Sequence, residues 1–485
     1  MQVAGNPQRP SREQLLKLAR ENPEAIVDLV LMLWDRVDKL EAELAELKKN
    51  SRNSSKPPSS DKNNPNRPKQ KAGKKGKRRK QGGQHGHPGH TLCKVDDPDR
   101  VVIHKLPGAC AECGANLGAA QDYESRQVFD LPQNIQMEVT EHRAEVCLCS
   151  GCASHVKASF PAEVKAPVQY GDRIKALVIY LQIYQLLPCE RLSQLCEDVF
   201  NCPISPATVA NFLKKAGARA QPVVQKIKEK IRQAPFIHCD ETGLSLFGKG
   251  HWLHTASTPR FTFLHIDQKR GYQAIKTMDI LEGYKGWTIH DYYSSYYRME
   301  GLLHGLCNAH HIRDLTYIDE ELGQHWAGDM IGLLLKSKEH KERELARGRC
   351  VGAKTLDRLQ NRCFQILEEG YCLNPEPQRR PGQRGRIKRG KALNLLNRFR
   401  DRHEEVIAFL THDIPFDNNE AERDLRMMKT KQKISGCFRS FAHAIAFANL
   451  RSIIATARKQ AVNALDIIRA TLSDHRLAER LLFTT

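Results

Sequence analysis

Apolar side chains repeat every seven residues near the start of the chain. One core position of the repeat holds Val30, Val37 and Leu44, and the other holds Ile26, Leu33, Leu40 and Leu47. Charged residues between positions 39 and 49 flank this pattern, as in a coiled coil. About three heptads are near the lower limit for a coiled coil, and a helix that packs on its own protein stays open as the alternative. We expect residues 1–50 to form a helical, coiled-coil segment through which copies of the chain associate.

A polar, basic stretch follows the heptads. Residues 51–95 are rich in Asn, Ser, Pro, Gly and Lys, and positions 62–80 hold ten Lys or Arg residues and no acid. Such a stretch cannot bury enough apolar surface to fold, so a disordered linker is expected. Its charge would bind DNA phosphates without sequence preference.

The rest of the chain alternates between strand-like and helical patterns. Short apolar runs such as 101–103 predict strands, and later stretches with longer periodicity predict helices. We expect a multidomain α+β protein divided as follows: a zinc-binding module over 96–165, a helical DNA-binding region over 166–233, the first part of an α/β core over 234–316, a helical stretch over 317–412 that a loop at 374–391 interrupts, and the last part of the core with C-terminal helices over 413–485.

The net charge of the chain indicates which kind of molecule it binds. The chain has 76 Lys and Arg against 56 Asp and Glu, a formal net charge of +20. This excess favours a polyanion, and double-stranded DNA is the expected one. No run of about 18 apolar residues is present to span a bilayer, and the N-terminus lacks the apolar core of a signal peptide. We therefore expect a cytoplasmic, nucleoid-associated protein without a membrane partner, whose cysteines are reduced unless they bind metal.

Two Cys-x-x-Cys pairs predict a structural zinc site. Cys110 and Cys113 form the first pair, and Cys149 and Cys152 form the second after 35 intervening residues. Four thiolates complete a tetrahedral Zn²⁺ shell, which leaves no open position for catalysis. Cys147 is an alternative to Cys149 at the second pair.

A helix-turn-helix pattern precedes the core. Residues 191–200 predict a helix and residues 201–203 a break, after which Ser205 suits a helix N-cap and Pro206 the first helical position. The second helix would expose Asn211, Lys214 and Lys215, as a recognition helix in a major groove does. An ordinary structural hairpin has the same pattern.

Two aspartates follow short apolar runs. Asp240 ends the run 235–239, and Asp291 ends the run 286–290. Residues 251–255 and 261–267 predict two further strands, and residues 271–278 a short helix. Hard oxygen ligands on neighbouring strands can hold a divalent metal ion. We therefore expect Asp240 and Asp291 to be metal ligands.

The third acid is expected on a helix near residues 417–426. Asp417 is predicted to be the N-cap, with Glu420 as its capping-box partner three residues later. Glu420 and Glu422 lie about 200° apart around a helix, so they cannot both face one metal pair. The cap gives Glu420 a structural role, and Glu422 is therefore predicted to be the third ligand.

Several of these stretches closely resemble the motifs of the insertion-sequence-66 transposase family. They are, in the order of the chain, the heptads, residues 53–61, the double Cys-x-x-Cys module, residues 238–242, 290–296, 307–310 with Arg313, 417–423 and 433–440. The resemblance implies a ribonuclease H-like core with a helical insertion before the last acid. It implies a bacterial transposase that cuts and joins DNA with two Mg²⁺ ions, which sit about 3.5–4 Å apart in such sites.

Other polar residues near these motifs are expected to contact DNA or to shape the site. The candidates for clamping phosphates are His310, Arg313, Arg423, Arg426, Lys433 and Arg439. Cys307 and His310 offer two zinc ligands, which are too few for a site, so they are interpreted as packing or positioning groups. Accessory proteins are possible partners.

Two other functions stay open on sequence grounds. A ribonuclease H-like nuclease without strand transfer would have the same metal site. A non-catalytic DNA-binding regulator would use only the zinc and coiled-coil parts. An inactive relic of a transposase is a third possibility, but the presence of all three carboxylates argues against it.

Overall fold

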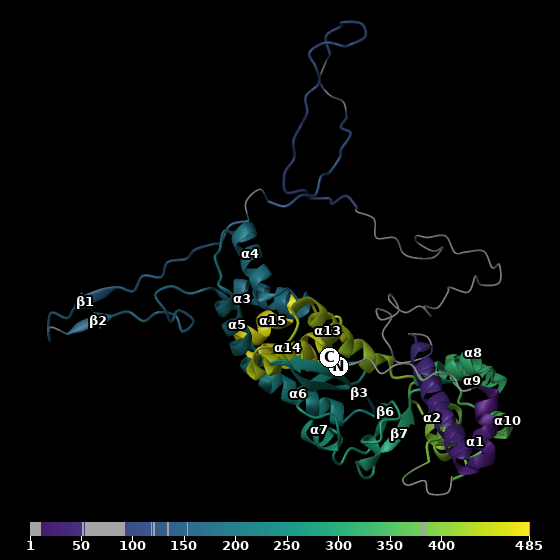
Figure 1. Cartoon of the computed structure of the whole chain (residues 1–485). Coiled ribbons are helices and arrows are strands. Elements are labelled where there is room, and N and C mark those ends of the chain that lie inside the picture. The colour runs from purple at the N-terminus through teal and green to yellow at the C-terminus, as the bar shows by residue number, and fades with distance from the viewer. Residues whose placement is uncertain are drawn as a thin grey trace.

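The computed structural model describes residues 11–50, 53, 93–117, 119, 122–132, 135–152, 154–379, 385 and 387–484. Nearly all of the expected linker at 51–95, including the basic run 62–80, lies outside the described residues. Figure 1 shows a body of helices around one sheet, from which the segment that carries β1 (Val146–Leu148) and β2 (His155–Lys157) extends away. The mixed α/β, multidomain character expected from the sequence is confirmed.

The central sheet has the order β5-β4-β3-β6-β7. Its strands are β3 (Phe236–Leu246), β4 (Lys249–Ser257), β5 (Thr262–Asp267), β6 (Trp287–His290) and β7 (Leu303–Leu306). The first three form an antiparallel meander, whereas β6 and β7 run parallel to β3. The strands predicted at 251–255 and 261–267 are confirmed as β4 and β5. The predicted short helix is α7 (Tyr272–Thr277), between β5 and β6.

Helix α14 (Phe441–Lys459) lies at the centre of the fold. It packs on β5 and on the helices α5 and α6 (Figure 1), and apolar residues on most of its circumference are buried. Strand β5 is the edge of the sheet, where backbone N–H groups lack a strand partner. Two hydroxyls of α14 accept these hydrogens, Ser452 from Leu264 at 3.0 Å and Thr456 from Thr262 at 3.0 Å. The helix therefore closes this edge of the sheet.

The remaining helices of this body precede the sheet or end the chain. They are α3 (Asp172–Ile179) with a π-helical turn (Tyr180–Tyr184), α4 (Cys189–Phe200), α5 (Pro206–Arg219), α6 (Gln221–Arg232), α13 (Asn419–Ser435), α15 (Ala464–Ser473) and α16 (His475–Phe483). The predicted hairpin is confirmed, because α5 begins at Pro206 and the Ser205 hydroxyl accepts the Thr208 N–H at 3.2 Å.

A second group of helices connects β7 to α13. It contains α8 (Asn308–Leu322), α9 (His325–Ala346), α10 (Ala353–Leu373), α11 (Lys391–Asp401) and α12 (His403–Thr411). These helices have an apolar core of their own, which includes the buried Trp326, Leu396 and Phe399. A smaller cluster joins Ile289 of β6 to Phe409 of α12. The group is therefore packed on the edge of the sheet that carries β6 and β7.

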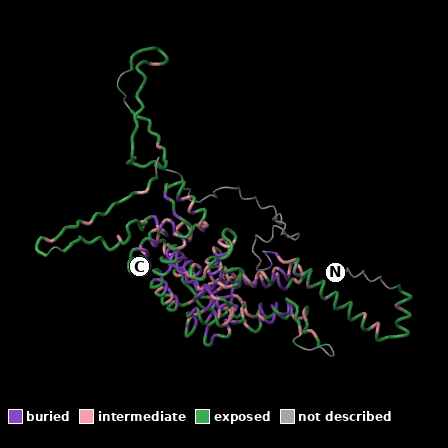
Figure 2. The backbone as a smooth tube through the Cα atoms, turned by 60° about the vertical axis from the view of Figure 1, so that its left-hand side comes forward, coloured by how far each residue is buried: buried purple, intermediate pink, exposed green. Residues whose placement is uncertain are grey.

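The N-terminal helices are almost entirely exposed (Figure 2). They are α1 (Arg12–Glu21) and α2 (Pro23–Leu47). The heptad side chains from Val30 to Leu47 are 43–61% exposed. The heptad side chains therefore do not pack on the described part of their own chain, as the alternative expected. The strand predicted at 101–103 is wrong, because these residues are exposed and pair with no strand among the described residues.

The crossing of α5 and α14 depends on a glycine. A Cβ atom at Gly217 would lie 2.4 Å from the Cβ of Ala446, which is closer than side chains can approach. We predict that Gly217→Ala lowers the free energy of unfolding by about 1–3 kcal/mol, the usual range for overpacking. Gly332 of α9 is the matched control, because a Cβ there would meet nothing within 4 Å. Gly332→Ala should instead stabilise the chain by about 0.8–1 kcal/mol. Urea unfolding of both variants measures the difference, and equal effects would contradict the close crossing.

Candidate active site

Asp240 and Asp291 lie at the same level of two adjacent strands. The parallel pairing of β3 with β6 ends with His238 opposite Ile289, and each aspartate stands two residues beyond that pair. Asp240 is not at the end of its strand, as the sequence suggested, because β3 continues to Leu246 along β4. It stands where β3 loses β6 as its neighbour. The two aspartates therefore lie on adjacent segments, just past the point where the pairing of β3 with β6 ends.

Electrostatics place Glu422 of α13 in the same group. Burial raises the pKa of Asp240 well above its ordinary value, and the charges of Glu241, Asp291 and Glu422 raise it further. Such a mutual effect requires carboxylates that lie close together. The charges of Asp291 and Glu422 therefore reach Asp240, but within the described residues the ligand atoms of these three acids do not form a group that lies within 4.8 Å of one another.

Asn418 fixes the position at which α13 begins. Its buried side-chain oxygen accepts a hydrogen bond from His238 Nδ1 at 2.9 Å, and its side-chain N–H donates to the Cys239 carbonyl at 2.7 Å. Its backbone N–H donates to Cys307 Sγ at 3.1 Å. The start of α13 is therefore tied to β3 and to the end of β7. Sequence reasoning assigned no role to Asn418, although its place beside the acids was a usable signal.

The predicted capping box is wrong. The N-cap of α13 is Asn418, not Asp417, and no side chain caps the first turn. Asp417 accepts only the nearby Asn419 N–H, at 3.1 Å. Glu420 binds Lys459 at 2.9 Å and Arg423 at 3.2 Å. The tie between Asn418 and β3 replaces the local cap that the sequence pattern indicated.

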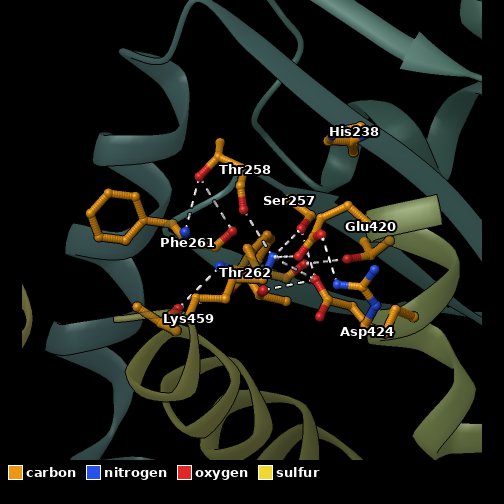
Figure 3. A network of polar contacts seen from close by, with 12 residues as sticks. His238, Ser257, Thr258, Phe261, Thr262, Glu420, Asp424 and Lys459 are labelled. Carbon is orange, nitrogen blue, oxygen red and sulfur yellow. Dashed lines mark hydrogen bonds and ion pairs between the residues drawn. The ribbon is translucent and has the colours of Figure 1, made fainter. Parts of the chain in front are cut away.

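A polar network holds the other face of α13 (Figure 3). Asp424, whose side chain is 10% exposed, accepts hydrogens from Ser257 at 2.7 Å, Thr262 at 2.8 Å and Lys459 at 3.0 Å. Glu420, one turn earlier on the helix, shares the same Lys459. Glu422 is two residues from both Glu420 and Asp424, about 200° around the helix from each, so it points to the opposite side. Glu420 is therefore held by ion pairs and not by the predicted cap, and Glu422 stays the predicted third ligand.

Glu422 lies beside the first turns of α8. Arg313 contacts its two carboxylate oxygens at 3.5 and 3.3 Å, and His310 Nε2 lies 3.7 Å from one of them. Burial and the charge of Arg313 lower the pKa of His310, so the imidazole is neutral at pH 7. Cys307 is the N-cap residue of the same helix, and its thiol is buried.

Glu241, the acid that follows Asp240, has a different role. Glu241 is buried, and Arg270 binds it at 2.8 Å while the Tyr296 hydroxyl donates to it at 2.9 Å. Arg270 also stacks over the Tyr293 ring, 4.1 Å from its centre. The Tyr293 N–H donates in turn to Asp291 at 3.1 Å. This arrangement, which the sequence did not predict, neutralises Glu241 and supports the loop that carries Asp291.

The residues predicted to contact DNA lie in two places. Asn211, Lys214 and Lys215 are exposed on α5. His310 and Arg313 are half-buried beside Glu422, whereas the exposed residues are Arg423, Arg426, Lys433 and Arg439, which lie on α13 and just after it. The structure does not bring the α5 group and the active-site group together into one cluster.

The four candidate zinc ligands lie in two separate turns. Gly114, with φ of +73°, follows Cys113 and donates its N–H to the Cys110 carbonyl at 2.9 Å. Backbone hydrogen bonds from Cys113 and Glu112 lower the pKa of Cys110, and hydrogen bonds from Ser154 lower that of Cys152. Cys147 lies within β1, outside the second turn. Among described residues, no group of three or more close ligand atoms includes these thiols.

Most of the chain matches models of known protein families. The family described as transposase IS66 matches residues 167–446, more than half of the chain, and the zinc-finger binding domain of the same transposase matches residues 107–153. A family of unknown function matches residues 9–92. No curated protein matches. None of the described helices could cross a membrane. A zinc-binding domain followed by a sheet that carries Asp240 and Asp291 is thus part of a chain that belongs to the IS66 family of transposases.

Proposed function

We propose that this transposase cuts and joins DNA with two Mg²⁺ ions held by Asp240, Asp291 and Glu422. The observation that carries the proposal is the placement of Asp240 and Asp291 at the same level of adjacent strands, where the charge of Glu422 also acts on Asp240. Carboxylate oxygens are the ligands that Mg²⁺ prefers, so the donor set fits the ion. When bound, the ions would supply an activated water and stabilise the leaving oxygen.

The fold supports a ribonuclease H-like core. The meander β3-β4-β5, followed by β6 and β7 parallel to β3, is the sheet that the family resemblance implies. The helices α8–α12 stand between β7 and the helix that carries the last acid, as expected of a helical insertion. We propose the domain limits 1–50, 51–95, 96–165, 166–233, 234–316, 317–412 and 413–485 on this basis.

Residues around the carboxylates are suited to hold a phosphodiester. In the first step a water oxygen bonds to phosphorus, the bond to the 3′ oxygen breaks, and a 3′ hydroxyl is left. In the second step this hydroxyl attacks a phosphorus of the target, whose own 3′ oxygen leaves. Arg313 contacts Glu422 at 3.3–3.5 Å, which is long for an ion pair, so it can turn to the phosphate charge. His310 lies beside it, and we propose that both contact phosphates.

A joining assay tests this function. The full chain is incubated with Mg²⁺, target DNA and an element end that already carries a free 3′ hydroxyl. Joined product that requires Mg²⁺ is expected. Cleavage without any joined product would favour a nuclease, and binding without either reaction would favour a regulator.

We propose that α5 contacts the element ends. Its exposed Lys214 and Lys215 lie on the helix that follows the confirmed break. We predict that Lys214→Ala with Lys215→Ala lowers the slope of log affinity against log salt by about 2, because each phosphate contact contributes about 0.9. Fluorescence anisotropy at several salt concentrations measures the slope.

The matched control removes the same charge elsewhere. Lys336 of α9 and Lys354 of α10 are exposed lysines outside the predicted DNA-binding region. The double variant Lys336→Ala, Lys354→Ala should keep the wild-type slope. If both double variants lower the slope equally, α4 and α5 are a structural hairpin and not a recognition element. Asn211 and the exposed arginines and lysine at 423, 426, 433 and 439 are proposed as further DNA contacts.

The zinc and N-terminal parts have supporting roles. We propose that Cys110, Cys113, Cys149 and Cys152 hold the structural Zn²⁺ of the zinc-binding domain, since hydrogen bonds favour the thiolate at Cys110 and Cys152. The exposed heptad stripe of α2 supports self-association through a coiled coil. Accessory proteins and a cytoplasmic, nucleoid-associated location are proposed because the element ends lie in bacterial DNA.

A further inference from the structure

A Cys, a His and a Glu converge next to the active site. The ligand atoms of Cys307, His310 and Glu422 all lie within 4.8 Å of one another. The sequence offered only the Cys-x-x-His pair, which is too small for a metal site. The third ligand comes from α13, 112 residues after His310, and only the fold brings it there.

The Cys307 sulfur lies in an environment that suits a metal thiolate. The backbone N–H of Asn418 donates to it at 3.1 Å, and the backbone of His310 also hydrogen-bonds to it. Such donors stabilise negative charge on sulfur. They oppose the burial that raises the pKa of this thiol to about 12, so an incoming ion has to displace its proton.

The imidazole and the carboxylate are already near ligand spacing. Ligand bonds of about 2.0–2.2 Å in a tetrahedral zinc site place nitrogen and oxygen ligands about 3.4 Å apart. His310 Nε2 and Glu422 Oε1 are 3.7 Å apart. The Nδ1 atom of His310 is buried and has no hydrogen-bond partner within the described structure. The Nε2 atom itself lies 3.4 Å from Arg313 Nη1, a contact that an incoming ion would replace, and shifts on the order of 1 Å would complete the three-ligand group.

We propose that Cys307, His310 and Glu422 bind a thiophilic divalent cation such as Zn²⁺, and that this ion inhibits the transposase by taking Glu422 away from the magnesium site. Sulfur and imidazole ligands select zinc over Mg²⁺, which prefers oxygen. Arg313 contacts the same carboxylate and leaves it when the ion binds. The three ligands leave a fourth position for water. The proposed binding of the ion does not depend on what Glu422 does in catalysis. The proposed inhibition, in contrast, rests on the proposed function of Glu422 as a magnesium ligand.

Cobalt absorption tests the binding. Co²⁺ is added to the full chain with its zinc-binding domain already loaded with zinc, and the sulfur-to-cobalt absorption band is followed. The wild type should take up one equivalent with this band, and Cys307→Ser should not develop it. His310→Gln should keep the thiol but weaken binding by at least about 10–100-fold, the loss seen when even an indirect metal partner is removed. Urea unfolding checks that each variant is folded.

Cys363→Ser is the matched control, because Cys363 is also buried but lies in α10 among apolar residues. This variant should bind Co²⁺ like the wild type. No cobalt band in the wild type, or the same band in folded Cys307→Ser, would overturn the proposed site.

The joining assay with fixed Mg²⁺ and added Zn²⁺ tests the inhibition. Half-inhibition of Cys307→Ser, measured relative to its own uninhibited rate, should need at least about tenfold more Zn²⁺ than the wild type. If Zn²⁺ inhibited both proteins equally, the inhibitory role would be contradicted. The cobalt result would still decide whether the site exists. A wild type that binds Co²⁺ but joins no DNA at any Zn²⁺ level would count against the proposed function and not against the site.

Discussion

Asp240→Asn and Asp291→Asn are each expected to abolish DNA cleavage and joining while the chain stays folded. The loss should be about a thousandfold or more, the scale on which single groups of a catalytic unit act. Each substitution removes the negative charge of a proposed metal ligand and leaves an amide of nearly the same shape. Single-turnover cleavage and joining of labelled element ends in Mg²⁺ measure the loss.

The free energy of unfolding distinguishes this loss of activity from damage to the fold. The pKa of Asp240 is raised in the folded chain, so its ionised form opposes folding above the ordinary Asp pKa. Asp240→Asn removes that charge and should leave the free energy of unfolding at pH 7 unchanged or higher. Asp267→Asn is the control, because this carboxylate lies on β5 and accepts the Lys269 N–H and the Thr277 hydroxyl, away from the site. It should keep near wild-type activity. Active Asp240→Asn protein would contradict the account.

Glu422→Gln and Glu420→Gln are expected to separate catalysis from stability. Glu422 lies beside His310 and Arg313 on the side of Asp240, so its substitution should lower joining by about a thousandfold or more. Glu420 binds Lys459 on the opposite side of α13. Its substitution should leave most activity but lower the free energy of unfolding by about 1 kcal/mol, as for a partly exposed ion pair.

The two variants control for each other, because both replace a carboxylate by its amide within one turn of one helix. Joining assays and urea unfolding on both proteins give the comparison. If Glu422→Gln still joined strands and Glu420→Gln did not, the third ligand would be Glu420.

Local signals in the sequence predicted much of the fold. Ser205 and Pro206 marked the start of α5 correctly, since a cap and a fixed proline φ act within one turn. Runs of aromatic and β-branched residues identified β4 and β5. The same local reasoning failed at Asp417, because Asn418 is held by β3 and β7, which are more than 100 residues away. A tertiary contact there replaced the expected capping box.

The candidate site was only partly predictable for the same reason. Asp240 and Asp291 could be proposed from the strands before them, although the continuation of β3 past Asp240 depends on its pairing with β4. The support of Glu241 by Arg270 and Tyr296 joins three separate segments, and no periodicity signals it. Likewise, Cys307 and His310 could not be related to Glu422 before the fold placed α13 beside α8.

Binding of Mn²⁺ tests the central claim most directly. Free Mn²⁺ is counted by its paramagnetic resonance while it is titrated into the full chain bound to element-end DNA, with one equivalent of zinc present for the zinc-binding domain and none in excess. The proteins compared are the wild type, Asp240→Asn, Asp291→Asn, Glu422→Gln and Glu420→Gln. The wild type and Glu420→Gln should bind two Mn²⁺ ions per active site, and the other three variants should lose at least one. Equal Mn²⁺ binding by all five proteins would contradict a metal site at Asp240, Asp291 and Glu422.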